Sequence, residues 1–128
     1  MRLLLDTVTF LYAVGEPERI SGHAKDLFLD PRNEIYLSTV STWEIAIKYS
    51  LGKLDLSEPP GRLVPEHRAR LGATSLPLDE ESTLHLIRLP RMHSDPFDRI
   101  LICQAMVQGM VLVTPDEQIS RYPVRTAW

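Results

Sequence analysis

Four carboxylic acids in this chain could together bind a divalent cation. They are Asp6, Glu44, Asp98 and Asp116. Clustered carboxylate oxygens suit Mg²⁺ and Mn²⁺. Two unit charges about 4 Å apart repel by about 4 kcal/mol at an effective dielectric constant near 20, so a cluster of ionised acids needs protonation or a cation to compensate. A metal held in this way can activate a water and orient a phosphodiester for hydrolysis.

Three of these acids, taken singly, also fit helix capping. Ser41 and Glu44 have the spacing of a capping box. The sequence Asp95-Pro96-Phe97-Asp98 fits an N-cap followed by proline at the first helical position, and Thr114-Pro115-Asp116-Glu117 fits the same scheme. An acid near a helix N-terminus gains about 0.3–1 kcal/mol from the helix dipole. A shared metal site is favoured over capping only if the acids lie together.

Hydrophobic runs and turn residues predict the elements that must position the acids. Strands are predicted at residues 2–5, 34–38, 74–76 and 110–114 and at Val124. Helices are predicted at residues 7–14 closed by Gly15, 17–29, 41–51 closed by Gly52, 66–71, 79–89, 95–108 closed by Gly109, and 115–121. Residues 55–65 are rich in proline and are predicted to form an exposed connection.

Alternating strands and helices predict an α/β fold in which helices cover both faces of a mainly parallel sheet of about four or five strands. One domain is expected to span residues 1–128. Ligand sites in such sheets lie at the carboxyl ends of the strands. Asp6 and Asp116 follow predicted strands, and Glu44 and Asp98 lie in the first turns of helices. We therefore expect the four acids to converge at this edge.

Composition narrows the class of protein. The chain is 44% hydrophobic and 24% charged, as in globular proteins, and no apolar run approaches the roughly 20 residues that span a bilayer. The apolar start ends at Asp6, too early for a signal peptide. The single cysteine, Cys103, is interpreted as a core residue. We predict a cytoplasmic protein with no membrane partner. The net charge of -3 disfavours a nucleic-acid partner unless cations neutralise the acids.

Blocks of sequence along nearly the whole chain resemble the PIN-domain ribonucleases of toxin–antitoxin pairs, the VapC toxins. The blocks are Leu3-Leu4-Leu5-Asp6-Thr7, Ser41-Thr42-Trp43-Glu44-Ile45-Ala46-Ile47-Lys48, Leu51-Gly52-Lys53-Leu54, His93-Ser94-Asp95-Pro96-Phe97-Asp98-Arg99 with Ile102 and Gln104-Ala105, Val113-Thr114-Pro115-Asp116, and Tyr122-Pro123-Val124. Many relatives have His after the first Asp-Thr, where this chain has Val8.

The resemblance implies a three-layer α/β/α PIN-like fold and a metal-dependent endoribonuclease, the toxin of a type II toxin–antitoxin system. It assigns Mg²⁺ or Mn²⁺ to a site made by Asp6, Glu44, Asp98 and Asp116. Asp98 is favoured as the ligand over Asp95, which would be its cap or a supporting neighbour, and Thr114 would support the site through its hydroxyl. The implied partners are RNA, a second copy of the chain, and a small antitoxin whose C-terminal segment fills the groove and offers a basic residue.

Several other side chains have two interpretations. Arg99 and Lys48 could bind phosphate or could pair with a site carboxylate. Trp43 could stack on a base but is favoured as a core residue, and Trp128 is expected to pack onto the sheet. Arg91 and His93 could contact RNA, while a capping or solvent role is as good an interpretation of His93. No Cys and His cluster predicts a zinc site.

Four other functions would each need particular features of the sequence. A haloacid-dehalogenase-type phosphatase would need a second aspartate two residues after Asp6, where Val8 stands. A receiver domain would need an acidic neighbour of Asp6. Within the resembling family, the alternatives are an RNA-processing nuclease that is not a toxin and a PIN-like interaction module that has lost catalysis. All four acids are present, which favours a catalyst.

Overall fold

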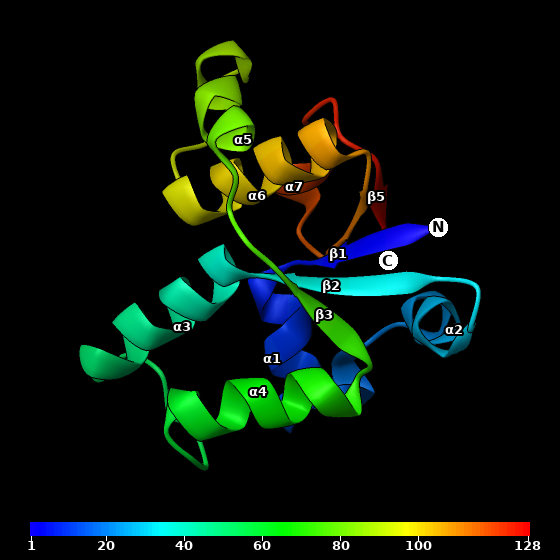
Figure 1. Ribbon diagram of the computed structural model, residues 1–128, viewed down its shortest axis with the longest axis vertical. Helices are drawn as coiled ribbons and strands as arrows, with labels where there is room; N and C mark the ends of the chain where they lie inside the picture. Colours follow the sequence, from blue (N-terminus) through cyan, green and yellow to red (C-terminus); the bar gives the residue numbers. More distant parts are fainter.

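A five-stranded sheet in the order β3-β2-β1-β4-β5 runs through the middle of the molecule, and every pair in it is parallel (Figure 1). The computed structural model describes residues 1–128. The strands are β1 (Arg2–Leu5), β2 (Glu34–Ser38), β3 (Ala73–Leu76), β4 (Val111–Val113) and β5 (Thr126–Ala127). The prediction of a mainly parallel sheet of four or five strands is confirmed.

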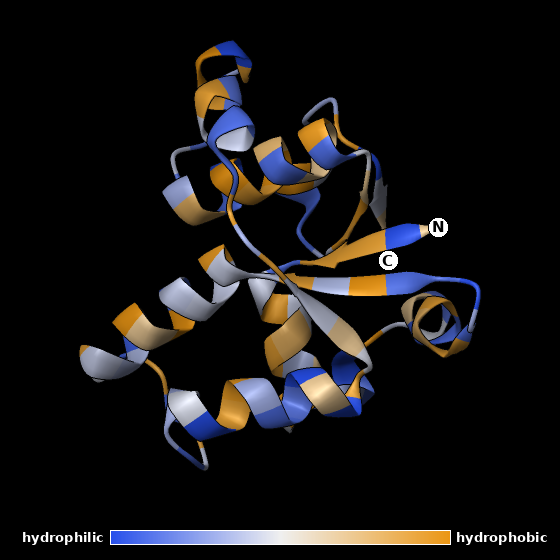
Figure 2. Ribbon diagram, in the orientation of Figure 1, coloured by the Kyte–Doolittle hydropathy of each residue, from blue (hydrophilic) through white to orange (hydrophobic).

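Helices cover both faces of this sheet and give the predicted three-layer α/β/α architecture (Figure 1). One face carries α1 (Thr7–Gly15), α2 (Gly22–Leu29) and α4 (Pro60–Arg70). The other carries α6 (Pro96–Gln108) and α7 (Glu117–Ser120), and α5 (Glu80–His85) packs against α6. Successive strand side chains point to opposite faces, so Leu3 and Leu5 join the first core while Leu4 joins the second. Figure 2 shows β1 as hydrophobic except at its start.

The prediction of one continuous helix over residues 17–29 is wrong. A short 3-10 helix (Pro17–Arg19) ends at Ile20, which is extended and buried, and α2 begins after Ser21. The Ser21 hydroxyl accepts a hydrogen bond from the Ala24 N–H at 3.0 Å. This N-cap restarts the helix, because the side-chain acceptor satisfies a free N–H of the first turn.

The connection predicted at residues 55–65 is also wrong in its second half. Helix α4 begins at Pro60 and contains Pro65. A proline at the first helical position sacrifices no hydrogen bond, whereas Pro65 removes one inside the helix. Leu63 and Val64 are both 1% exposed and pack in the core, and burying them offsets this loss.

Helix α3 (Thr39–Ser50) begins two residues before the predicted start, because Ser38 rather than Ser41 is its N-cap. The preference for Trp43 as a core residue is wrong: its side chain is 59% exposed and lies edge-on to Phe97, with ring centroids 5.4 Å apart. The buried stripe of α3 is Val40, Ser41, Glu44 and Ile45. Trp43 lies outside this stripe.

The remaining elements lie close to their predicted positions, with three local differences. Helix α5 stops at His85, and a 3-10 helix (Leu86–Arg88) completes the predicted segment. Asp116, not Thr114, is the N-cap of α7. The last strand is Thr126–Ala127 rather than Val124, since β4 pairs there through Leu112 and Val113. Cys103 is fully buried, and Trp128 packs beside Tyr12 with ring centroids 6.4 Å apart, as predicted.

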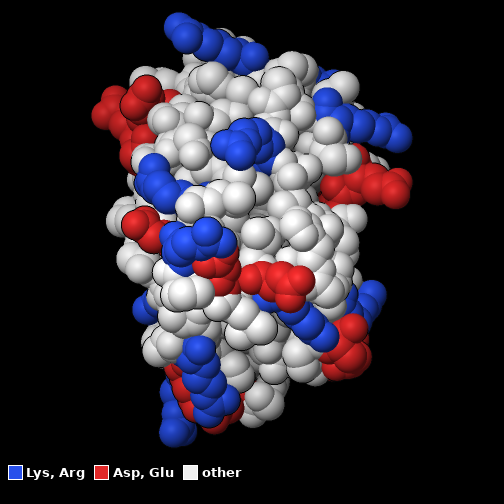
Figure 3. All heavy atoms as spheres, turned by 90° about the vertical axis from the view of Figure 1, so that its right-hand side faces the viewer, with Lys and Arg blue, Asp and Glu red and all other residues white.

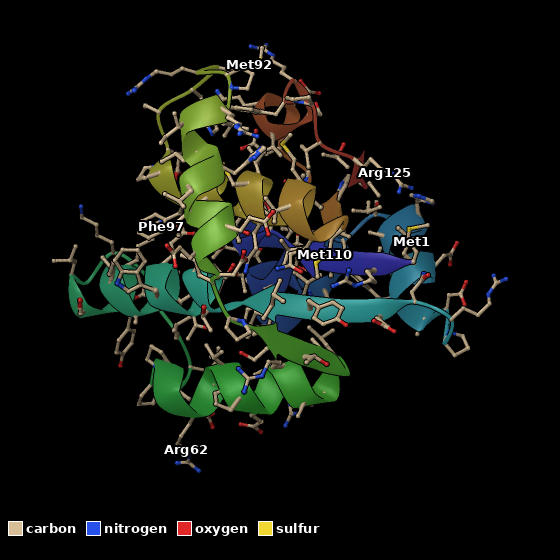
Figure 4. All side chains as sticks on the ribbon, turned by 45° about the horizontal axis from the view of Figure 1, so that its top comes forward. Met1, Arg62, Met92, Phe97, Met110 and Arg125 are labelled. Carbon is tan, nitrogen blue, oxygen red and sulfur yellow. The ribbon has the colours of Figure 1, made fainter.

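The carboxyl ends of the strands lie on the side opposite the N-terminus. In Figure 1, β1 starts beside the N mark and runs left toward α1, and α3 and α6 begin at the same side. Figure 4 shows the two ends of the molecule, with Phe97 at the start of α6 on the left and Met1 on the right. On the right-hand face, basic and acidic side chains are interspersed (Figure 3). No helix is both long and apolar enough to cross a bilayer.

Candidate active site

A cleft of about 600 Å³ opens at the carboxyl edge of the sheet. The four acids predicted from the sequence all line it, namely Asp6, Glu44, Asp98 and Asp116. Asp95 and the two lysines Lys48 and Lys53 line it as well. The four acids reach the cleft from the ends of β1 and β4, from the first turn of α6 and from the second turn of α3, because α3 begins two residues before its predicted start. The parallel sheet therefore brings together residues that are up to 110 positions apart in the chain (116 - 6).

Asp6 is the most constrained acid of the cleft. It is only 3% exposed, and its carboxylate accepts hydrogen bonds from the Thr7 N–H at 2.8 Å and from the Thr114 hydroxyl at 2.7 Å. Burial raises the pKa of Asp6 to about 7, although the two hydrogen bonds act in the opposite direction. The charges of Asp98 and Glu44 raise this pKa further, because each disfavours another negative charge nearby.

Thr114 connects the ends of the two central strands. Its hydroxyl donates to Asp6 and accepts a hydrogen bond from the Asp116 N–H at 3.0 Å. Asp116 in turn caps α7 by accepting from the Gln118 N–H at 2.9 Å. Two acids of the cleft are thus held in place through one buried hydroxyl, the contact through which Thr114 was expected to support the site.

Glu44 has no capping role, contrary to the capping-box interpretation. The hydroxyl of Ser41, its proposed partner in the box, instead accepts a hydrogen bond from the Thr7 hydroxyl at 2.9 Å. One carboxylate oxygen of Glu44, Oε2, pairs with Lys48. The other, Oε1, is buried and has no hydrogen-bond partner. A buried carboxylate oxygen without a donor is costly, so this atom indicates a missing positive partner.

The two aspartates at the start of α6 have different hydrogen-bond partners. Asp95 caps the helix by accepting from the N–H groups of Phe97 and Asp98, at 2.9 and 3.2 Å. Asp98 is free of capping and is paired instead with His93, with Asp98 Oδ2 and His93 Nε2 3.0 Å apart. Burial raises the pKa of Asp98, His93 lowers it, and the charges of Asp95 and Asp116 raise it.

The structure shows which protein groups contact the basic side chains for which the sequence allowed two roles. Lys48 pairs with Glu44, which is the salt-bridge interpretation. Arg99 forms no salt bridge with a site carboxylate: its Nη1 donates to the Pro90 carbonyl oxygen at 3.0 Å and to the Tyr122 hydroxyl at 3.1 Å. Phosphate binding by Arg99 stays a prediction. Lys53 lines the cleft and forms no ion pair within the protein.

The oxygen atoms of the cleft fit a hard divalent cation. As the side chains stand, no three His, Cys, Asp or Glu residues are grouped to hold one ion. Hydrogen bonds within the protein occupy oxygens of Asp6, Asp98 and Asp116. The donor set is nevertheless all carboxylate, as Mg²⁺ and Mn²⁺ prefer. Glu44 Oε1 has no partner in the protein, and the charges of Glu44 and Asp98 add to the effect of burial on the pKa of Asp6, so a bound cation would reduce the repulsion between these acids.

Sequence reasoning missed Tyr122 beside the cleft, and for His93 it offered an RNA contact or a capping or solvent role instead of a contact with an acid. His93 contacts Asp98, and Tyr122 contacts His93, with Tyr122 Oη 2.8 Å from His93 Nδ1. The sequence carried a signal for His93 alone, namely its place five residues before Asp98 in an acidic block. The contact with Tyr122 joins residues 29 positions apart, and no local pattern indicates it.

Comparisons with known proteins identify relatives of this geometry. The PIN domain family matches residues 3–124. Ribonuclease VapC16 of Mycobacterium tuberculosis is 48% identical over 56 residues, which are 44% of this chain and 40% of that protein. The matched segment thus spans about two fifths of the curated relative's length.

Two solved structures have similar folds. The structure of VapBC2 from Rickettsia felis bound to a promoter DNA fragment matches with a TM-score of 0.74 and 17% identity, covering 99% of this chain and 98% of the matched one. DNA-bound VapBC from Salmonella typhimurium matches with a TM-score of 0.71 and 19% identity, covering 99% and 97%. At these identities the likeness shows the fold.

Proposed function

Because this chain belongs to the PIN-domain family, we propose that it is an Mg²⁺- or Mn²⁺-dependent endoribonuclease and the toxin of a type II toxin–antitoxin pair. One observation carries the proposal. Asp6 and Glu44 are buried acids on the same cleft, and Glu44 Oε1 has no partner in the protein. A bound cation compensates this arrangement, whereas a site used only for helix capping has no need of it.

Asp6, Glu44, Asp98 and Asp116 would hold the ion. When bound, the ion supplies Lewis-acid activation of a phosphodiester and of the attacking water. The protein fixes its acids in advance: Thr7 and Thr114 orient Asp6, and Gln118 orients Asp116. Lys48 neutralises one oxygen of Glu44, and the other, Oε1, has no partner in the protein and would be available to the ion. No covalent intermediate with the enzyme is required.

RNA as the substrate is supported by the name of the curated relative, a ribonuclease, and by the cations of the cleft. Lys53 lies at the cleft without an acidic partner, so its ammonium is available to a phosphate of the bound strand. The net charge of -3 explains why such binding depends on the metal. Until cations neutralise the acids, the cleft repels a polyanion.

The test is cleavage of a single-stranded RNA by the purified protein. We expect endonucleolytic products with Mg²⁺ or Mn²⁺ and none in EDTA, with activity restored when Mn²⁺ is added back in excess. Sequencing of the product ends identifies the cleavage site. Equal cleavage with and without the chelator would contradict the proposal, because a metal-independent nuclease would not need this acidic cleft.

An antitoxin partner is supported by a second, more apolar groove that continues from the cleft. The groove measures about 240 Å³ and shares Leu11 and Leu54 with the acidic cleft. Val14, Leu56 and Leu63 line its far part. An extended segment with apolar side chains can lie in the groove while a basic residue at its end reaches the acids. Occupation of this kind blocks the cleft to RNA.

We expect Leu56→Glu to weaken binding of the antitoxin by about 10-fold or more, because the groove loses an apolar contact and the new carboxylate, near Glu16 and Asp55, must lose water on binding. Co-purification and calorimetric titration measure the loss. RNA cleavage by the variant should remain, but it should resist inhibition by the partner. Leu29→Glu, at the exposed end of α2, is the matched control. Equal inhibition of both variants would place the partner elsewhere.

A homodimer, a cytoplasmic location and a single domain over residues 1–128 stay predictions. Large apolar side chains that a second copy could cover remain exposed on α3 and on the segment from α5 onward, among them Trp43, Leu84 and Ile87.

A further inference from the structure

The Tyr122 hydroxyl joins two distant parts of the chain beside the cleft. Tyr122 is 3% exposed and follows α7. Its oxygen accepts hydrogen bonds from the N–H groups of Met92 and His93, at 3.2 and 3.1 Å, and from Arg99 Nη1 at 3.1 Å. It also lies 2.8 Å from His93 Nδ1. The segment before α6, where Figure 4 labels Met92, is thus fastened to the C-terminal part of the chain.

The partners of the two ring nitrogens of His93 indicate which nitrogen donates and which accepts a hydrogen bond in the neutral ring. An ionised carboxylate only accepts hydrogen bonds, so Nε2 must donate to Asp98 across the 3.0 Å contact. In the neutral ring, Nδ1 then has no proton and accepts from the Tyr122 hydroxyl. In this tautomer the Tyr122 hydroxyl donates to Nδ1 at 2.8 Å rather than to the His93 carbonyl oxygen, which is 3.5 Å away, and its oxygen accepts from the N–H donors. The imidazole is therefore held at both ends.

The Asp98 carboxylate, like that of Glu44, has a single partner in the protein. The side chains of His93 and Asp98 are only 12% and 16% exposed, so water competes little with their contact. His93 provides the one hydrogen bond that the protein makes to the Asp98 carboxylate. Asp6 and Asp116, in contrast, are held by main-chain N–H groups of the helices that they begin.

We propose that His93, Tyr122 and Arg99 form a positioning chain that orients Asp98 for cation binding. His93 contacts Asp98, while Tyr122 and Arg99 act through His93. The inference rests on the proposed function in one respect, namely that Asp98 is a ligand of the ion. It explains why two separate blocks of the sequence, residues 93–99 and 122–124, belong to one site.

Titration calorimetry with Mn²⁺ on the purified full-length chain tests the positioning chain without any RNA. Loss of a residue that orients a metal ligand typically lowers metal affinity about 10–100-fold. We expect a loss in this range for His93→Ala and a loss of about 10-fold for Tyr122→Phe, which does not touch Asp98. His93→Gln should recover most of the affinity, because its amide N–H can donate where Nε2 does. His23→Ala, on the exposed surface of α2, should match wild type.

Thermal melting shows whether each variant is folded. If Tyr122→Phe does not fold, Arg99→Gln replaces it, since it removes the cation from the hydroxyl and keeps the buried ring; a smaller loss of Mn²⁺ affinity is expected. Wild-type affinity in folded His93→Ala and in the Tyr122→Phe or Arg99→Gln variant would overturn the proposal. Wild-type affinity in Asp98→Asn would instead remove Asp98 from the metal site and so contradict the proposed function.

A measurement without metal tests the contact itself. The ¹⁵N spectrum of the His93 ring should show a protonated Nε2 in the metal-free protein at neutral pH, because Asp98 accepts from it. An unprotonated Nε2 would overturn the positioning chain whatever the metal affinities are.

Discussion

Asp6→Asn is expected to lower metal-dependent RNA cleavage about 100-fold or more, because it removes an ion-binding oxygen at the most constrained position of the cleft. The variant should fold. The asparagine oxygen can still accept from the Thr7 N–H, and the Thr114 hydroxyl can turn to accept from the new amide. Initial rates at saturating Mn²⁺, with RNA in excess, measure the loss.

The control for this experiment is Asp26→Asn, the same chemical change on the exposed surface of α2. It should leave the rate at the wild-type value. Cleavage by Asp6→Asn at a rate close to wild type would contradict a catalytic role for the cleft, and a contaminating nuclease would reveal itself by equal activity in both variants.

The same substitution is expected to stabilise the metal-free protein at alkaline pH. The folded protein keeps a proton on Asp6 up to a pKa of about 7, whereas the model value for a free carboxyl is 3.8. Between these values the folded state binds more protons than the unfolded state, so the free energy of unfolding falls as the pH rises. A shift of this size corresponds to at most about 4 kcal/mol between pH 4 and pH 8.

Urea denaturation in EDTA at pH 5 and pH 8 measures this effect. Wild type should lose stability toward pH 8, and Asp6→Asn should lose about 2–3 kcal/mol less, since asparagine carries no charge to bury. Mn²⁺ at pH 8 should restore wild type and have little effect on the variant. Equal pH dependence in the two proteins would show that Asp6 is not under electrostatic strain in the cleft.

Asp6→Asn is expected to lower the rate of RNA cleavage and to raise the free energy of unfolding at alkaline pH. One substitution removes activity and adds stability, a combination that arises when acids are gathered for a cation rather than for packing. A residue that served only the fold would lose stability when changed, and its loss of activity would follow the unfolded fraction.

The fold was largely predictable from the sequence because its signals are local. Apolar runs with turn residues between them gave β1, β2 and β4. Asp95-Pro96 and Gly109 gave both ends of α6, and Gly109 has a φ of 68°, the left-handed geometry that glycine adopts without strain. The rule that parallel strands share a carboxyl edge then predicted where Asp6, Glu44, Asp98 and Asp116 meet.

Prediction failed where distant contacts decide between local alternatives. Pro60 and Pro65 indicated a loop, but burial of Leu63 and Val64 keeps α4 helical. A helical tryptophan indicated a core residue, but the face of α3 that carries Trp43 has no sheet beneath it.

The sequence by itself therefore determined which acids belong to the cleft and at which edge they lie, since strand ends and helix starts follow from interactions over a few residues. Only the tertiary structure decided what each acid does there. It made Asp95 and Asp116 caps, freed Glu44 and Asp98 from capping, and placed Thr114, Lys48 and His93 beside Asp6, Glu44 and Asp98. The physical reason is that hydrogen bonding and desolvation of a buried carboxylate depend on every element packed around it, including residues such as Tyr122 that are distant in the chain.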